Sequence, residues 1–227
     1  MKKLTEEQVS KMKNALSELC DWYHLLQPMT ILSENTALFN IDTNMGFVYS
    51  GPMANPLAAE RIPKIVELFT KANEKSIPII LATECHDESC LEFNDYPPHC
   101  IRGSEEANII PELENFKTDF VVHKNSTNTF HENEIKEWLN NHRNITTIVF
   151  CGFVTDICIM QFAVSVKTYC NNIGRKIDIV ICEPAVQSYD LNVGDIQVDH
   201  NADLHHLMGL RFMHNAGCII ASDVIFQ

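Results

Sequence analysis

Six short runs of β-branched and apolar residues, separated by stretches with helical periodicity, constrain the fold of this chain more than any other feature. The runs cover 36–42, 77–83, 119–124, 145–152, 177–183 and 217–222. Each is almost continuously apolar, which is typical of strands in a parallel sheet that is covered on both faces. Helical patterns lie between them, at 57–75, 131–142, 155–172 and about 200–215. This alternation predicts βαβ units and a three-layer α/β/α fold around a mainly parallel six-stranded sheet.

Size and composition limit the classes of protein to consider. The chain has 227 residues, 45% of them hydrophobic, and we expect a single domain over 1–227. The formal net charge of −13 repels phosphate backbones, so nucleic acid is not an expected partner. No run approaches the roughly 20 apolar residues of a membrane span, and the N-terminus lacks the apolar core of a signal peptide. The nine cysteines show no disulfide-framework spacing, so we expect reduced thiols and a cytoplasmic location.

The N-terminal segment carries a helix-start signal. Thr5 and Gln8 fit a capping box, with Thr as the N-cap and Gln at the third helical position. The pattern predicts an extra helix at about 5–26, ahead of the alternating strands and helices. This helix either covers an edge of the sheet or builds a subunit interface in a homo-oligomer.

Three reactive side chains stand at the ends of three predicted strands. Asp42 closes the first run, Lys124 closes the third, and Cys158 follows the fourth across a short turn. The carboxyl ends of parallel strands share one edge of a sheet, where the ligand sites of α/β proteins lie. A thiolate can attack as a nucleophile, a carboxylate can accept the thiol proton, and a nearby lysine lowers the thiol pKa. The helix that begins near Thr155 would add N–H groups suited to a developing oxyanion.

Each of these residues also has an ordinary structural explanation. Asp42 could cap the next segment, Lys124 could be a solvated lysine, and Cys158 could be a buried thiol in the first turn of a helix. Their joint placement at three strand ends favours a catalytic set.

The long irregular segment at 84–117 contains a second group of reactive residues. A structureless stretch of this length inside a compact domain is usually functional. Glu84 and His86 lie on the same side of an extended segment, and Glu92 and His99 follow. Carboxylate and imidazole together suit Zn²⁺, Mn²⁺ or Fe²⁺, although a polar loop with incidental histidines fits equally well. Spacing alone does not choose between these four residues and their rivals, which are Cys85, Asp87, Cys90, Asp95 and Cys100.

Three blocks of the sequence resemble the catalytic blocks of the isochorismatase-like cysteine hydrolases, whose best-known members are nicotinamidases. The blocks read "ALFNIDTNMGF", "VVHKNSTNTF" and "VFCGFVTDICIMQFAVSV", and the resemblance runs from about Thr36 to Ser222. The third block is the most specific, because a Gly-x-x-Thr-Asp-x-Cys string after a strand is close to diagnostic of the family. The first block departs from the family form, with Gly46 before Phe47 where Asp-Phe is usual.

The resemblance implies a role for each strand-end residue. Cys158 would be the nucleophile, Asp42 the general base and Lys124 its electrostatic partner. The N–H groups of Thr155 and Cys158 would form an oxyanion hole. The family also carries a cis peptide bond before this threonine, which here would join Val154 to Thr155.

The resemblance also implies one divalent metal ion. Nicotinamidases bind it through an Asp-x-His pair and a later His in a Pro-His context, and some add a Glu seven residues before that His. The corresponding residues here are Glu84, His86, His99 and Glu92. Glu84 stands where the family has Asp, and its longer side chain would shift the ion or bind it through water.

The reaction implied by the resemblance is nicotinamide + water → nicotinate + ammonia, through a thioester on Cys158, within NAD salvage. Phe47 and Tyr96 would line the substrate pocket, whereas Cys85 stands where many relatives carry an aromatic residue. Two alternatives stay open. One is another small-amide or carbamoyl hydrolase of the same family, and the other is a non-catalytic metal- or thiol-responsive protein on the same fold.

Overall fold

The six apolar runs form one parallel sheet in the computed structural model of the chain, which describes residues 3–191 and 200–227. The strand order is β4-β3-β2-β5-β6-β7, and every neighbouring pair is parallel. This confirms the predicted six-stranded sheet. The strands are β2 (Thr36–Ile41), β3 (Ile79–Glu84), β4 (Phe120–Lys124), β5 (Thr147–Phe153), β6 (Asp178–Gln187) and β7 (Ile219–Ala221).

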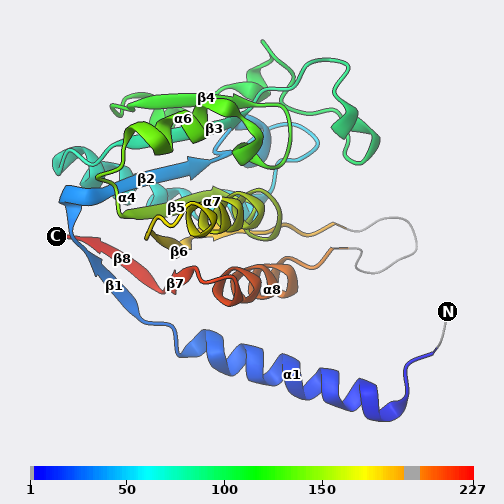
Figure 1. Cartoon of the computed structure of the whole chain (residues 1–227). Coiled ribbons are helices and arrows are strands. Elements are labelled where there is room, and N and C mark those ends of the chain that lie inside the picture. Colours follow the sequence, from blue (N-terminus) through cyan, green and yellow to red (C-terminus); the bar gives the residue numbers. More distant parts are fainter. Residues whose placement is uncertain (1–2, 192–199) are drawn as a thin grey trace.

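Helices cover both faces of this sheet and complete the three predicted layers (Figure 1). One face packs against α6 (Asn133–Asn141), α7 (Met160–Asn172) and α8 (Ala202–Asn215). The other face packs against α4 (Ile62–Glu74). Burial of apolar side chains on both faces explains why the strand sequences lack alternation. Shorter helices are α2 (Met45–Val48), α3 (Pro56–Ala59), α5 (Pro111–Glu114) and the 3-10 turns Ser33–Asn35, Leu91–Asn94, Glu105–Ala107 and Thr129–His131.

Two predicted helices differ in detail from those observed. The helix expected at 57–75 is divided into α3 and α4, and Pro63 lies in the first turn of α4, where proline favours a helix start. The helix expected at 155–172 begins as the π-helical Cys158 turn (Thr155–Ile159) and continues as α7.

A second, two-stranded parallel sheet was not predicted. It joins β1 (Pro28–Ile31) to β8 (Asp223–Phe226), with Pro28 opposite Asp223. Four-residue runs carry little periodicity, and their pairing partners lie at opposite ends of the chain, so local pattern does not reveal them.

The N-terminal helix α1 (Glu6–His24) begins with the predicted capping box, in which the Thr5 side chain accepts a hydrogen bond from the Gln8 N–H. Its C-terminal end lies beside α8, while its N-terminal end extends away from the sheet (Figure 1). No residue of α1 is fully buried. The single domain expected over 1–227 includes residues 1–2 and 192–199, which lie outside the described residues.

Two further expectations concern the state of the cysteines and the presence of membrane-spanning helices. All nine cysteines are free thiols, as expected from their spacing. Within 3–191 and 200–227, no helix combines the length and the apolar character that crossing a membrane requires.

Candidate active site and metal centre

The site lies where the strand order reverses. The chain proceeds from β2 outward through β3 and β4, and then returns to the other side of β2 for β5, β6 and β7. The carboxyl ends of β2 and β5 therefore flank a topological switch point, where open α/β sheets bind their ligands. Asp42 directly follows β2, and the Cys158 turn follows β5.

The structure brings the three strand-end residues together in a buried cluster. Lys124 Nζ lies 2.9 Å from an Asp42 carboxylate oxygen and 3.8 Å from Cys158 Sγ. Asp42 and Lys124 are fully buried, and Cys158 is 4% exposed. Asp42 adopts a φ of +52°, a strained value for a non-glycine residue that is typical of functional sites. Its N–H donates to the Ala82 carbonyl, which holds the backbone in place.

Burial dominates the proton affinities in this cluster. It raises the pKa of Asp42 to about 7, although Lys124 opposes the shift. It also raises the pKa of the Cys158 thiol well above its usual value, so the resting sulfur is protonated. Burial alone would lower the pKa of Lys124, but Asp42, Cys158 and Glu84 outweigh it and hold that pKa well above its usual value. The cluster therefore pairs a neutral thiol with a carboxylate that exchanges protons near neutral pH.

Gly152, just before the Cys158 turn, is required by the close approach of two neighbouring strands. Its φ is +111°, and a Cβ at this position would lie 1.9 Å from the Ile41 carbonyl oxygen of the adjacent strand. The backbone of β5 thus approaches β2 too closely for any side chain.

The position of the cis peptide bond corrects one expectation. It joins Phe153 to Val154, not Val154 to Thr155. β5 remains paired with β6 through Phe153, so the chain leaves the sheet at the next peptide. Thr155 itself does not line the cavity beside Cys158, and its hydroxyl lies 2.9 Å from His206 Nδ1.

The four predicted metal-binding residues also converge. Glu84 Oε2 lies 2.7 Å from His99 Nε2 and 3.2 Å from His86 Nε2, and a Glu92 oxygen lies 3.8 Å from His86 Nε2. One ligand atom from each of these residues lies within 4.8 Å of all the others. Two imidazole nitrogens and two carboxylates form a donor set that fits a divalent transition-metal ion.

Both histidines are oriented through their other ring nitrogen. His99 Nδ1 lies 2.8 Å from the Pro97 carbonyl oxygen, and His86 Nδ1 lies 3.2 Å from Asn125 Oδ1. Such contacts fix the ring of a metal-ligating histidine and direct the remaining nitrogen at the ion. The two Nε2 atoms that face Glu84 are thus in position to bind a cation.

The rival ligands lie outside this cluster. The Cys100 thiol is directed at the Glu106 carbonyl, 3.5 Å away, and Asp87 pairs with Arg102 at the surface. Cys90 Sγ lies 3.4 Å from His86 Nδ1, on the side of the ring that faces away from Glu84.

Glu84 connects the two groups of residues. Its Oε1 accepts a 2.6 Å hydrogen bond from Lys124 Nζ, while Oε2 faces the two histidines. Burial alone would raise the pKa of Glu84, but Lys124, His86 and His99 outweigh it and hold that pKa well below its usual range. The Glu84 carboxylate therefore reaches the lysine and the histidines together.

Cys158 lines a cavity together with three of the metal-binding candidates, Glu84, Glu92 and His99. Phe47 and Tyr96 also line this cavity, and the Phe47 ring meets the His99 ring edge-on with 5.6 Å between centroids. Sequence reasoning missed Tyr189, which also lines the cavity. Tyr189 stands just beyond the carboxyl end of β6, so the same strand-end rule, applied to β6, would have identified it.

Known proteins match this chain over most of its length. The family model for the isochorismatase domain matches residues 36–168. Nicotinamidase 1 of Arabidopsis thaliana is 25% identical over 235 residues, which cover 89% of this chain and 96% of that protein.

Solved structures share the fold. A nicotinamidase from Bacillus subtilis superimposes with a TM-score of 0.67 at 24% identity, covering 83% of this chain and 99% of that one. A pyrazinamidase of Pyrococcus horikoshii, solved in complex with zinc, superimposes with a TM-score of 0.64 at 18% identity, covering 85% and 99%.

Proposed function

Since the chain belongs to the isochorismatase family, a family of hydrolases that act on amide C–N bonds, we propose that it is a metal-dependent cysteine amidohydrolase whose substrate is nicotinamide. The observation that carries the proposal is the convergence of Asp42, Lys124 and Cys158 beside a cluster of two histidines and two carboxylates. Similarity to Nicotinamidase 1 of Arabidopsis thaliana supports the choice of substrate.

Asp42 is the better of two candidate bases for the Cys158 thiol. Glu84 Oε1 lies 3.9 Å from the sulfur, but its carboxylate is occupied by Lys124 and the histidines, and its pKa is held well below the usual range. Asp42 has a pKa of about 7, and a general base is most effective when its pKa lies near the operating pH. Lys124 stabilises the ionised Asp42 and the thiolate that forms.

The first half-reaction forms a thioester. Asp42 accepts the thiol proton while the sulfur attacks the carboxamide carbon, and the carbonyl π electrons move onto oxygen. The backbone N–H groups of Thr155 and Cys158 would stabilise this oxyanion. As the C–O double bond re-forms, the C–N bond breaks, and Asp42 returns its proton so that ammonia leaves.

The second half-reaction releases the acid. Asp42 accepts a proton from water, the resulting hydroxide attacks the thioester carbon, and the C–S bond breaks. Asp42 returns this proton to the sulfur, the carboxylic acid loses its own proton to solvent, and nicotinate leaves, which NAD salvage would consume. Glu84, His86, Glu92 and His99 would hold a divalent ion, which would supply a Lewis acid to help orient the substrate ring.

Ammonia release from nicotinamide tests the activity and the nucleophile together. We expect turnover in the presence of Zn²⁺, Mn²⁺ or Fe²⁺, and its loss in Cys158→Ala. Cys151→Ala is the matched control, because Cys151 is a buried β5 thiol outside the catalytic cluster. Metal-bound wild-type protein without turnover would contradict nicotinamide as the substrate, and other small amides and carbamoyl compounds would be tested next.

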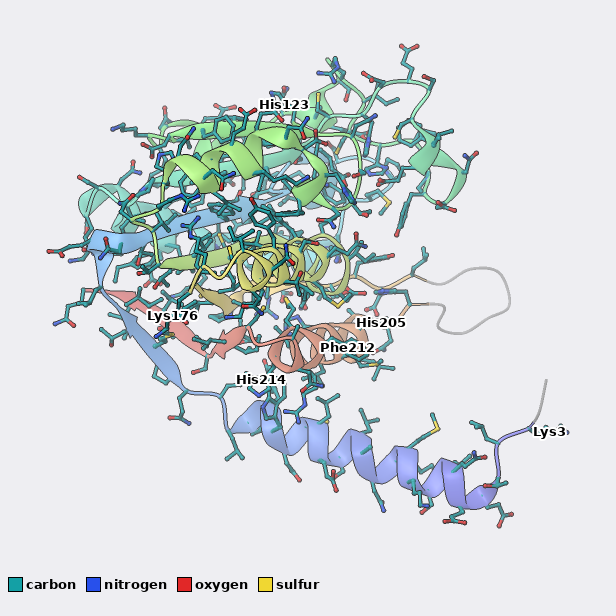
Figure 2. All side chains as sticks on the ribbon, in the orientation of Figure 1. Lys3, His123, Lys176, His205, Phe212 and His214 are labelled. Atoms are coloured by element: carbon teal, nitrogen blue, oxygen red, sulfur yellow. The ribbon has the colours of Figure 1, made fainter. Side chains whose placement is uncertain are left out.

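Calorimetric titration with Zn²⁺ tests the metal centre independently of turnover. His99→Ala should weaken binding at least tenfold, since it removes one of two imidazole ligands. His123→Ala is the control, because His123 is exposed on β4 (Figure 2) and contacts Thr83 outside the metal cluster. Equal Zn²⁺ affinity in the two variants would exclude this cluster as the binding site.

A further inference from the structure

A chain of hydrogen-bonded side chains links the N-terminal helix to the Cys158 turn. The Tyr23 hydroxyl of α1 donates to Glu183 Oε1 of β6 at 2.7 Å. The same oxygen lies 3.3 Å from His206 Nε2 of α8, and His206 Nδ1 lies 2.9 Å from the Thr155 hydroxyl. The catalytic scheme above uses none of Tyr23, Glu183 and His206.

Burial and charge set the direction of these hydrogen bonds. Thr155, His206 and Glu183 are 0%, 5% and 9% exposed. Burial would raise the pKa of Glu183, but His206 and Tyr23, helped by Arg61, outweigh it and lower that pKa. An ionised carboxylate only accepts, so Nε2 of His206 donates to it. The other ring nitrogen, Nδ1, lies 2.9 Å from the Thr155 hydroxyl and forms the second hydrogen bond of the ring.

The backbone of α8 also packs closely against the Cys158 turn. A Cβ at Gly209 would lie 2.9 Å from the Cα of Asp156, so the helix and the turn are in direct contact. Among residues 3–191 and 200–227, the only side-chain hydrogen bond to the Thr155 hydroxyl is the one with His206. A change at His206 therefore acts on the start of the turn that carries the sulfur.

We propose that His206 is a positioning residue for the reaction. Held by Glu183, and through it by Tyr23 of α1, His206 fixes the Thr155 hydroxyl and so the backbone that presents Cys158 and its N–H group. The proposal rests on the proposed function, in which Cys158 is the nucleophile. The proposal also gives α1 a function. This helix lies outside the residues matched by the family model, but its Tyr23 forms one end of the chain of hydrogen bonds.

Two substitutions at His206 separate its two contacts. In His206→Asn the amide lies where Nδ1 was and can still bond Thr155, but the contact with Glu183 is lost. In His206→Gln the amide lies near the place of Nε2 and keeps Glu183, but the contact with Thr155 is lost. We expect His206→Gln to lower kcat for nicotinamide about tenfold with little change in KM. His206→Asn should retain kcat within about threefold of wild type.

Alkylation of Cys158 by iodoacetamide, followed by peptide mass spectrometry, gives a readout that needs no substrate. His206→Gln should change the alkylation rate at least severalfold, and His206→Asn should not. If wild type lacks turnover but this difference holds, the proposed substrate is wrong and the positioning role stands. Equal alkylation rates in wild type and both variants would overturn the role, as would equal losses of kcat with equal falls in Tm.

Thr155→Val provides a second route if His206→Gln does not fold. Valine has nearly the volume of threonine but lacks the hydroxyl, so the hydrogen bond with Nδ1 of His206 is lost. We expect a lower kcat and an altered alkylation rate at unchanged KM. Wild-type values for both quantities would overturn the proposal.

Discussion

At the scale of single residues, Asp42 combines two properties that the proposed chemistry needs, namely burial and contact with a lysine. It is fully buried, yet its carboxylate contacts the lysine that stabilises its charged form. Burial outweighs the lysine, and the result is a carboxylate with a pKa of about 7. A solvated aspartate would be a much weaker base, because its pKa is about 4.

The pH dependence of kcat/KM follows from this pKa. Only ionised Asp42 can accept the thiol proton, and an acid with a raised pKa is ionised above that value. We therefore expect kcat/KM to fall about tenfold for each pH unit below about 7. Steady-state rates from about pH 5 to 8 would check this. A profile that stays level down to the ordinary pKa of aspartate would contradict it, and Asp42→Asn should show low activity throughout.

At the scale of secondary-structure elements, the contact between α8 and the Cys158 turn is sensitive to added volume. Gly209→Ala would place a methyl group 2.9 Å from the Cα of Asp156, and such overpacking typically costs about 1–3 kcal/mol. We expect a lower Tm by calorimetry and a lower kcat, because the turn must shift. Met208→Ala, at a partly exposed position on the same helix, should change neither. An unchanged Tm in Gly209→Ala would show that α8 can move away without cost.

The elements also show what local sequence can and cannot predict. The strand-end rule found Asp42 and Lys124 because Asp42 directly follows the fully buried β2 and Lys124 is the last residue of β4. It could not find His206, which lies mid-helix and owes its importance to residues from three other elements. Spacing left the metal ligands open among several residues, because only the folded loop turns Cys100 toward Glu106 and away from the histidines.

At the scale of the whole molecule, α1 stands apart from the rest. Val9, Met12 and Leu16 form an apolar stripe at helical spacing and are 38%, 60% and 44% exposed. The C-terminal part of the helix lies next to His214 of α8 (Figure 2), and Trp22 packs against that histidine. Within residues 3–191 and 200–227, these three side chains are thus left largely open to solvent.

Replacement of Val9, Met12 and Leu16 together by Gln tests whether that exposure persists in solution. If the chain acts alone, Tm should change by no more than a few degrees, since exposed substitutions usually have small effects. Trp22→Ala should lower Tm clearly, because it removes packing on α8. A marked loss of Tm or of apparent mass in the triple variant would instead show that a second copy covers the stripe.

The small sheet formed by β1 and β8 has a consequence for biosynthesis. Its strands are separated by about 195 residues, which a ribosome adds in roughly 10–40 s. The first strand therefore emerges long before its partner exists, and Tyr23 emerges long before His206. The interior of the large sheet can form during translation, whereas the N-terminal helix reaches its place only after the C-terminal segment has emerged. In the positioning role proposed for His206, the nucleophile reaches its final geometry only after α8 has emerged, so a nascent chain that stops before α8 carries an immature site.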